Sequence, residues 1–573
     1  MDLNGGTLLA KTLAGTAPVV FTLHGGHLDS FYRGCADEGI ELLDFRHEAA
    51  AVNAADGYAR VTGGLGVAAV TSGPGFANGF AGITNAYADD VPLLVIVAAP
   101  PLREVETREL QGGIDQIAAL TPVTKWAHRI TTPERIPDLV GLAVRRALSG
   151  RPGPVALELP IDVAFRPVNP AHVRPAGAPR IGARPGPGRR ALAEALEALE
   201  GAERPVVLVG EGARWARDGG TLVEFAETTG IPVLYGGPAS RGLPPRHPLN
   251  GHGVGSLVAL AMSGGGSPDV VALLGFTPGL SSGGRPGAVI PADAKIVQVD
   301  ADAGEIGRLG PVHVAVQADP VETMAALLAA HEGRPWRDRR EWAEKVVNAH
   351  RLMDLMYADA PDEVGGRLHP YHAARNALAA LDPGAIVIAD GGETAGWVSS
   401  AITATEPELL LNHGHQGHLG IGHGMAIGAQ RAEPGRRVVQ ITGDGAVGFH
   451  IQEFDTMVRH GLPIVTVVLS NDTWGMSVHG QDVVLGAGND LISRLAPTPY
   501  EKVAQAFGAH GEHVTEMGEV GPAVRRALDS GRPALVNLAV SNEVVHPMTT
   551  AMLGDVTAAD EIVIPYYENI PLK

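Results

Sequence analysis

The sequence has little cysteine, few aromatic residues and a shortage of positive charge. Cys35 is the single cysteine among 573 residues, which excludes an internal disulfide framework and any cysteine-rich zinc or iron–sulfur site. Lys and Arg number 44 against 63 Asp and Glu, and the net charge of −19 disfavours nucleic acid as a partner. With 5% aromatic and 45% apolar residues, the composition is that of a globular protein and not of a disordered chain.

Long hydrophobic runs and targeting signals are also missing. The most apolar stretch, 91–101, is about half as long as a helix that crosses a bilayer. Residues 1–13 contain no basic segment followed by an apolar run, and the last residues are Pro-Leu-Lys. Neither a secretory nor a peroxisomal signal is therefore expected. We expect a soluble, cytoplasmic protein that does not contact membranes.

The apolar pattern predicts an α/β protein of several domains, since the chain is about three to four times the usual domain length. Short runs that are apolar throughout alternate with longer helix-like segments, which is typical of parallel strands covered by helices on both faces. Strands are expected at 66–71, 93–98, 206–209, 270–274, 296–299, 385–389, 437–441, 464–469 and 534–538.

Two breaks divide the chain into blocks. A linker rich in Pro, Gly and Arg occupies 174–190, and a charged stretch within 332–370 includes a predicted helix at 337–356. We predict three doubly wound parallel-sheet domains, in which ligands bind beyond the carboxyl ends of the strands. Their expected boundaries are 1–173, 190–335 and 365–545, and a tail at 546–573 is too apolar to be a free end.

Two predicted strands lead into polar turns that suit a metal ion and a phosphate. Gly443, Asp444 and Gly445 follow one strand, and 25 residues separate Gly445 from Asn471, which follows the next. Glycines let the backbone approach an anion, and the N–H groups that open a helix can hold a phosphate. The carboxylate and amide oxygens are hard ligands suited to Mg²⁺. The alternative for the Gly-Asp-Gly motif alone is a tight turn, and for Asn471 alone it is a helix cap. These alternatives poorly explain the occurrence of both motifs at this spacing.

A second candidate set lies in the first block. Glu48 opens an alanine-rich segment, where its carboxyl group is expected to be shielded from water, and the turn 71–78 follows the next predicted strand. An ion-paired glutamate on a surface helix is the alternative interpretation of this segment by itself.

The Gly-Asp-Gly and Asn pattern, together with Glu48, resembles the thiamine-diphosphate (ThDP) enzyme superfamily. The resemblance implies that Asp444, Asn471 and the carbonyl of Thr473 hold Mg²⁺, and that Glu48 hydrogen-bonds N1′ of the cofactor's pyrimidine. It implies an apolar wedge at Leu419. Other cofactor contacts are implied at Pro74, Asn78, Gly417, Gly443, Gly445, Ala446 and Trp474. In this family the two facing domains come from different subunits, so we expect at least a homodimer and, commonly, a homotetramer.

Several segments resemble benzaldehyde lyase and its acyloin-lyase relatives more than acetolactate synthase. They are 23–29, 110–116, 124–129, 413–420, and 443–448 with 453–456 and 474–475. The resemblance implies that His27 and Gln111 lie beside the reacting thiazolium, with His413 on the opposite wall. Imidazole and carboxamide groups can hydrogen-bond the hydroxyl or alkoxide formed there, and a neutral histidine can relay its proton. A zinc site at His413, His415 and His418 is disfavoured because zinc would displace the cofactor.

Some positions depart from that branch. Ala395 stands where benzaldehyde lyase has a tyrosine, which predicts a roomier pocket. Met476 stands where the similar 2-hydroxyacyl-CoA lyases carry a catalytic glutamate, which disfavours acyl-CoA cleavage. The tail, in contrast, favours acyl-CoA cleavage, because benzaldehyde lyase ends sooner and acyl-CoA-using relatives have carboxyl-terminal lids. It is expected to pack over the site or a neighbouring subunit. The central block, with 208–214 and 298–302, resembles the domain that binds FAD in acetolactate synthases. Its Gly-x-Gly fragment lacks the full dinucleotide fingerprint, so FAD is not expected.

The sequence therefore predicts a ThDP- and Mg²⁺-dependent carbon–carbon lyase and carboligase acting reversibly on 2-hydroxy ketones (acyloins) and aldehydes. One alternative is a 2-hydroxyacyl-CoA lyase that forms formyl-CoA and an aldehyde or ketone. Two others are an acetolactate synthase-like enzyme and a non-catalytic member of the fold.

Overall fold

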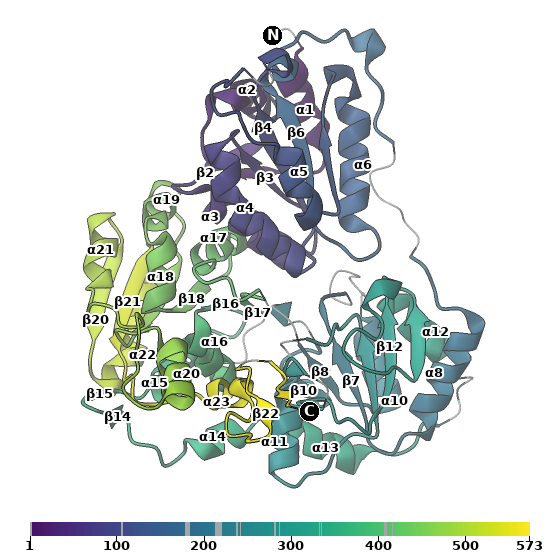
Figure 1. Ribbon diagram of the computed structural model, residues 1–573, viewed down its shortest axis with the longest axis vertical. Helices are drawn as coiled ribbons and strands as arrows, with labels where there is room; N and C mark the ends of the chain where they lie inside the picture. Colours follow the sequence, from purple (N-terminus) through teal and green to yellow (C-terminus); the bar gives the residue numbers. More distant parts are fainter. Residues whose placement is uncertain are drawn as a thin grey trace. The chain divides into compact units, whose positions relative to one another are not determined.

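Three larger β-sheets organise the chain, as Figure 1 shows. The structure is a computed structural model that describes residues 3–104, 107–177, 184–212, 220–236, 239–240, 242–279, 282–285, 287–331, 333, 335–405, 409–414, 416–565 and 567–572. Its internal contacts define two compact units. The first comprises Met1–Ala183, Ile421–Arg436 and His450–Ile464, and the second comprises Arg184–Gly420, Arg437–Phe449 and Val465–Lys573.

The first unit is built on six parallel strands in the order β2-β1-β3-β4-β6-β5. The strands are β1 (Val19–Thr22), β2 (Glu41–Asp44), β3 (Gly66–Val70), β4 (Leu93–Ala99), β5 (Trp126–Arg129) and β6 (Val155–Pro160). Its helices are α1 (Gly5–Leu13), α2 (Asp29–Glu38), α3 (Glu48–Thr62), α4 (Pro74–Ala88), α5 (Gln116–Leu120), α6 (Ile136–Leu148), α7 (Ile161–Ala164), α17 (Gly422–Ala432) and α19 (Glu453–Arg459). β3 and β4 are buried along their whole length, as the apolar runs predict.

Helix α17 packs closely along α3 because both helices are rich in glycine and alanine. A Cβ added at Gly57 of α3 would stand 2.4 Å from the carbonyl oxygen of Met425, and one at Gly428 of α17 would stand 2.0 Å from that of Ala54. Larger side chains would separate the two backbones. The close packing holds α3, whose first residue is Glu48.

The second unit contains the other two sheets. The central sheet has six parallel strands in the order β10-β8-β7-β11-β12-β13. The strands are β7 (Pro205–Val209), β8 (Val233–Tyr235), β10 (Asn250–Gly253), β11 (Val270–Leu274), β12 (Lys295–Asp300) and β13 (Val314–Gln317). The helices are α8 (Arg189–Gly201), α10 (Thr221–Thr229), α11 (Ser256–Met262), α12 (Pro320–Ala330), α13 (Arg340–Ala349) and α14 (Leu352–Met356).

The Gly-x-Gly fragment of this central sheet follows β7. A Cβ added at Gly210 would stand 2.4 Å from the carbonyl oxygen of Gly275, and one at Gly212 would stand 2.8 Å from the Cα of Gly275. Backbone packing within the sheet therefore accounts for both glycines. Ala213 and Arg214, which complete the predicted motif, lie outside the described residues.

The helix predicted at 337–356 is wrong in its extent. The structure has two helices there, α13 and α14, separated near His350. The Nδ1 atom of His350 lies 2.5 Å from the carbonyl oxygen of Val347, so a side chain takes the carbonyl that a continuing helix would bond with a backbone N–H.

The third sheet has seven strands in the order β20-β21-β19-β18-β16-β17-β9, all parallel except β9, which is antiparallel to β17. The strands are β9 (Ala239–Ser240), β16 (Ile386–Asp390), β17 (Leu409–Asn412), β18 (Val438–Gly443), β19 (Val465–Ser470), β20 (His510–Val514) and β21 (Ala534–Ala539). The helices are α15 (Pro370–Ala379), α16 (Gly392–Ser400), α18 (Asp444–His450), α20 (Gly475–Leu485), α21 (Tyr500–Ala506), α22 (Met517–Asp529) and α23 (Pro547–Leu553). Two small hairpins join β14 (Glu363–Val364) to β15 (Arg367–Leu368) and β22 (Glu561–Ile562) to β23 (Ile570–Pro571).

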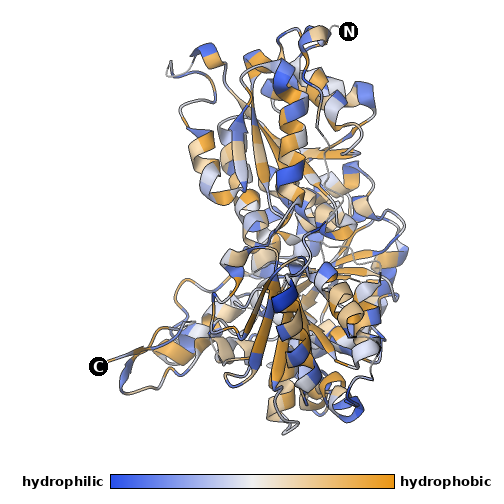
Figure 2. Ribbon diagram, turned by 90° about the vertical axis from the view of Figure 1, so that its right-hand side faces the viewer, coloured by the Kyte–Doolittle hydropathy of each residue, from blue (hydrophilic) through white to orange (hydrophobic). Residues whose placement is uncertain are grey.

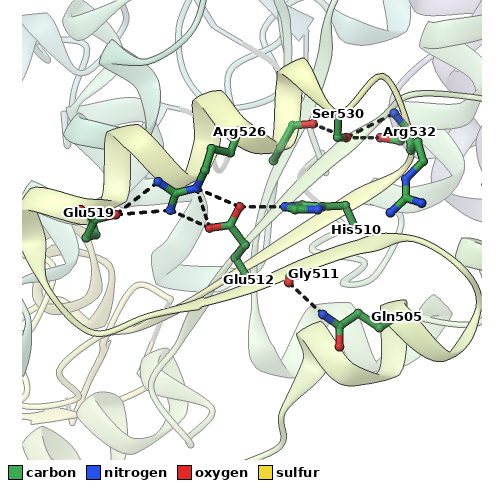
Figure 3. A network of polar contacts seen from close by, with 9 residues as sticks. Gln505, His510, Gly511, Glu512, Glu519, Arg526, Ser530 and Arg532 are labelled. Atoms are coloured by element: carbon green, nitrogen blue, oxygen red, sulfur yellow. Dashed lines mark hydrogen bonds and ion pairs between the residues drawn. The ribbon is translucent and has the colours of Figure 1, made fainter.

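Charged side chains lie on β20, an edge strand of this third sheet, and on helix α22, which packs against it (Figure 3). Arg526 of α22 donates to Glu512 of β20 over 2.7 Å and reaches Glu519 over 3.3 Å, while His510 lies 2.7 Å from Glu512. Burial raises the pKa of Glu512, but Arg526 and His510 outweigh it and hold that pKa below its usual value. Such a charged edge disfavours pairing with another strand.

The fold class is confirmed: parallel sheets alternate with helices through the chain. Figure 2 shows hydrophobic residues along the strands and hydrophilic residues on the outer sides of many helices. No helix among the described residues is long and apolar enough to cross a membrane.

Candidate active site

Glu48 lies at the first position of α3 and is 5% exposed. Its Oε2 atom accepts a hydrogen bond of 3.0 Å from the amide of Asn78 on α4. A Cβ added at Gly75 would stand 3.3 Å from Glu48 Oε1, so this glycine leaves room beside the second oxygen. Within the described residues Glu48 forms no ion pair, and the alternative of an ion-paired glutamate on a surface helix is therefore wrong.

The turn after β3, which leads into α4 at Pro74, packs against Gln111. Gly73 has a positive φ of 61°, and a Cβ there would stand 2.6 Å from the carbonyl oxygen of Gln111. Ser72 donates to that carbonyl over 2.9 Å, and Thr71 donates to Gln111 Oε1 over 3.3 Å. Because its carboxamide oxygen is bound, Gln111 presents its NH₂ group as a donor.

A series of buried hydrogen bonds, which the sequence did not predict, holds this turn in place. Gln116 accepts from the N–H of Gly73 over 3.0 Å and donates to Glu158 over 2.9 Å, and Arg129 binds Glu158 in turn. These residues come from the turn after β3 and from α5, β5 and β6, so no local pattern could have linked them.

His27 follows β1, and its loop contacts the same turn, since a Cβ at Gly25 would stand 2.2 Å from Thr71. The histidine is 9% exposed, and burial lowers its pKa, which favours the neutral ring. The first unit thus collects Glu48, Pro74, Asn78, Gln111 and His27 near the carboxyl ends of β1 to β3. We call these five residues the Glu48 cluster.

Asp444 begins α18 directly after β18, and Asn471 follows β19, the neighbouring strand. Asp444 Oδ1 accepts from the N–H of Gly445 over 2.9 Å, and Oδ2 accepts from the N–H of Asp472 over 2.7 Å. Asn471 Oδ1 accepts from the N–H of Thr473 over 3.2 Å. We call Asp444, Asn471 and Thr473 the Asp444 cluster.

The Asp444 cluster fits Mg²⁺ by its donors. A carboxylate, an amide oxygen and a backbone carbonyl are all hard oxygen ligands. Burial raises the pKa of Asp444 to about 6, although the N–H groups of Asp472 and Gly445 oppose this. Among the described residues Asp444 has no ion pair and Thr473 Oγ1 is a buried atom without a partner, so a cation there would compensate the buried charge.

Packing explains the residues around this cluster. A Cβ added at Gly445 would stand 2.4 Å from the ring of Trp474, and one at Gly443 would stand 3.0 Å from Thr394 Oγ1. Ala446 is buried next to them. Sequence reasoning missed Tyr500, whose hydroxyl donates to the carbonyl of Asp444 over 3.0 Å.

Asp472 was also missed. Its backbone has a positive φ of 59°, and its carboxylate accepts from Arg367 over 2.7 Å.

His413, Gly417 and Leu419 lie on the segment that follows β17. His413 Nε2 lies 3.0 Å from the carbonyl oxygen of Gly391 and therefore donates to it. Gly417 has a positive φ of 66°, and Leu419 is half-buried. Asp390, which was not predicted, joins this segment to the turn after β16 by accepting from Gly391 and Gly420 over 2.7 and 3.1 Å.

The zinc alternative involves His413, His415 and His418, of which His415 lies outside the described residues. Elsewhere in the part of the chain that the structure describes, no three His, Cys, Asp or Glu residues are grouped to hold a metal ion. Ala395 of α16 is half-buried against the core of the third sheet.

Comparison with known proteins gives consistent matches. Residues 3–119, 192–327 and 390–538 match, respectively, the N-terminal TPP binding domain, the central domain and the C-terminal TPP binding domain of thiamine pyrophosphate enzymes. The acetolactate synthase large subunit IlvG of Mycobacterium tuberculosis is 33% identical over 548 residues, which cover 95% of this chain and 97% of that protein. The 2-hydroxyacyl-CoA lyase of Oryza sativa is 30% identical over 94% of this chain and 96% of its own length, and the 2-hydroxyacyl-CoA lyase 2 of Bos taurus is 30% identical over 94% and 90%.

Proposed function

Because the chain belongs to the thiamine pyrophosphate enzyme family, whose members here make or break C–C bonds, we propose that it is a ThDP- and Mg²⁺-dependent lyase and carboligase for 2-hydroxy ketones and aldehydes. The observation that carries this choice is the chemistry of the predicted site residues. Burial lowers the pKa of His27 and favours its neutral form, Gln111 is an amide, and none of the predicted residues is Lys or Arg. Such a set favours an uncharged substrate over a carboxylate such as pyruvate.

In this proposal each residue has a defined task. The cofactor, when bound, supplies a thiazolium carbon that adds to carbonyl groups and accepts the electrons of the broken bond. Glu48 hydrogen-bonds the pyrimidine through Oε1 while Asn78 holds Oε2. Asp444, Asn471 and the carbonyl of Thr473 hold Mg²⁺, and the glycines on either side of Asp444 let the diphosphate approach.

Two donors orient the substrate in the same proposal. Gln111 donates its NH₂ group to the reacting oxygen, because Thr71 occupies the carboxamide oxygen. His27, in its neutral form, can accept or give one proton. We also expect a homo-oligomer, a dimer or a tetramer, as the resemblance implies.

A second candidate is 2-hydroxyacyl-CoA cleavage. It is favoured by the relatives with that name and by the carboxyl-terminal segment, whose helix α23 packs against α16 and α20 of the same unit. Met476, which cannot transfer a proton, weighs against it.

The experiment that separates these functions compares three substrates with the holoenzyme. Benzoin, a 2-hydroxyacyl-CoA and pyruvate are supplied in parallel, each with ThDP and Mg²⁺. We expect benzaldehyde from benzoin. Product from the thioester alone would replace the first proposal by the second, and CO₂ release from pyruvate alone would favour an acetolactate synthase-like activity.

A further inference from the structure

A buried carboxylate outside the predicted site connects three segments of the second unit. Glu393 lies in the first turn of α16 and is 7% exposed. Its Oε1 atom accepts a hydrogen bond of 2.5 Å from the hydroxyl of Thr549 on α23 and lies 2.8 Å from Nδ1 of His479 on α20. A single carboxylate oxygen therefore joins α16, α20 and the carboxyl-terminal segment.

The protons of this group can be assigned from its partners. His479 Nε2 lies 2.8 Å from the carbonyl oxygen of Asn542, which can only accept, so Nε2 carries a hydrogen. Burial lowers the pKa of His479, but Glu393 and the Asn542 carbonyl outweigh it and raise that pKa above its usual value. One hydrogen bond thus joins His479 Nδ1 to Glu393 Oε1, and the same oxygen accepts a second one from the hydroxyl of Thr549.

The other oxygen, Oε2, is left without a hydrogen bond from any described residue. A Cβ added at Gly475 would stand 3.3 Å from Glu393 Oε2 and 2.9 Å from the amide nitrogen of Asn471. The absence of a side chain at Gly475 therefore leaves space between the free carboxylate oxygen and a residue of the Asp444 cluster.

Met476 follows this glycine and adjoins the same turn. A Cβ added at Gly392, next to Glu393, would stand 3.2 Å from both Cβ and Sδ of Met476. The position at which 2-hydroxyacyl-CoA lyases are expected to carry an acid thus lies beside a carboxylate that comes from a different helix.

We propose that Glu393 is the acid–base residue of this site and exchanges a proton with the substrate hydroxyl through Oε2. This inference rests on the proposed lyase and carboligase function. In cleavage, the hydroxyl proton passes to Oε2, the electrons of the O–H bond form the new carbonyl, and those of the breaking C–C bond remain with the acyl fragment. In ligation the same proton returns from Oε2 to the oxygen of the aldehyde as the C–C bond forms. His479 and Thr549 keep Oε1 occupied, so that Oε2 is the oxygen that reacts.

A purely structural role is the competing explanation, because Glu393 also anchors the carboxyl-terminal segment. Ser400 offers a matched control, since it lies on the same helix and its hydroxyl is 3.0 Å from Nε2 of His546 in that segment. Ser400→Ala removes a comparable anchor without touching Glu393.

The test compares Glu393→Gln with Ser400→Ala in the full-length holoenzyme. Glutamine keeps the acceptor for Thr549 and the shape of the side chain but cannot exchange a proton. We expect E393Q to lower kcat by about 10²-fold or more. The Kd for ThDP, measured by quenching of tryptophan fluorescence, should change by less than about threefold, with little change in the melting temperature. S400A should leave kcat near that of the wild type.

A second variant returns an acid to the site. Adding Met476→Glu to E393Q should recover at least about tenfold of the lost kcat, because a carboxylate would then enter the same space from α20. No recovery would contradict the role of that space in proton transfer.

Other results would overturn the proposal. An unchanged kcat in E393Q would do so, and so would parallel losses of kcat, ThDP affinity and melting temperature that S400A reproduces. Rates are measured with whichever of benzoin, the thioester or pyruvate the wild type converts. If the wild type converts only the thioester or only pyruvate, the proposed function is refuted. The comparison of E393Q with S400A on that substrate still decides the role of Glu393.

Discussion

The Glu48 cluster and the Asp444 cluster both lie on turns after parallel strands, but their buried carboxylates have different surroundings. Glu48 accepts a side-chain hydrogen bond from Asn78 in a region crowded with glycine and alanine. Asp444 receives two backbone N–H groups, and its pKa is raised to about 6 by burial. The first arrangement suits a hydrogen bond to an organic ring, whereas the second suits an ion that compensates a buried charge. The clusters should therefore fail in different ways when changed.

The largest effect is expected from Glu48→Gln. Glutamine keeps the contact with Asn78 but cannot share a proton with a bound ring, so kcat should fall by about 10³-fold. Mg²⁺ affinity should hardly change. Steady-state rates and metal titrations measure the two quantities, and Glu38→Gln at the exposed end of α2 is the control. Full activity in E48Q would remove the catalytic assignment of the cluster.

The next effect concerns metal binding at the other cluster. Asp444→Asn should weaken Mg²⁺ binding by more than about 100-fold, since loss of a direct ligand exceeds the loss of an outer partner. In the wild type the carboxylate must be ionised to bind, so affinity should fall as pH drops below about 6. Calorimetric titration of the metal-free protein measures both effects, over a range from about one pH unit below that pKa to about two units above it.

If Mg²⁺ binds D444N as tightly as it binds the wild type, the contrast between the clusters disappears. Binding that does not depend on pH in this range would argue for ligands other than Asp444.

The smallest effect tests whether a raised pKa alone marks a functional acid. Glu453 of α19 is fully buried in the first unit, accepts from the N–H of Arg46 and from Thr456, and burial raises its pKa to about 7. The folded protein therefore binds this proton more tightly than the unfolded chain. The protonated Glu453 therefore adds to the free energy of unfolding at low pH, and this contribution is lost as the pH rises through about 7.

Glu453→Gln should remove this pH dependence, which corresponds to about 1 to 3 kcal/mol of unfolding free energy between pH 5 and pH 8. Denaturant unfolding at both pH values measures it, and Mg²⁺ affinity should stay at the wild-type level, unlike that of D444N. A loss of metal binding in E453Q would contradict the contrast between Glu453, which is not a proposed ligand, and Asp444, which is.

The sequence could predict a part of the site when all of its residues are contiguous in the chain. The run 438–446 contains its strand, its two glycines and its carboxylate, and the structure has β18 followed at once by α18. The segment around Glu48 could likewise be predicted as a helix from its alanines. The helix predicted at 337–356 is divided near His350, whose side chain bonds the backbone carbonyl of Val347.

Groups assembled from distant segments could not be predicted. Gln116 and Glu158 meet only because β4 and β6 are neighbours in the first sheet. Glu393, His479 and Thr549 come from three helices, and nothing in the residues around each one indicates the other two. The roles assigned to the site residues, and the domain boundaries, stay predictions.

The sequence by itself determined the kind of fold, the cofactor family and the turns that present single polar residues, because strand burial and turn geometry depend on neighbouring residues. Only the tertiary structure decided which oxygen of Glu48 and of Glu393 is bound, and that both oxygens of Asp444 are. Hydrogen bonds between segments far apart in the chain make that choice, and they exist only once the sheets and helices have packed.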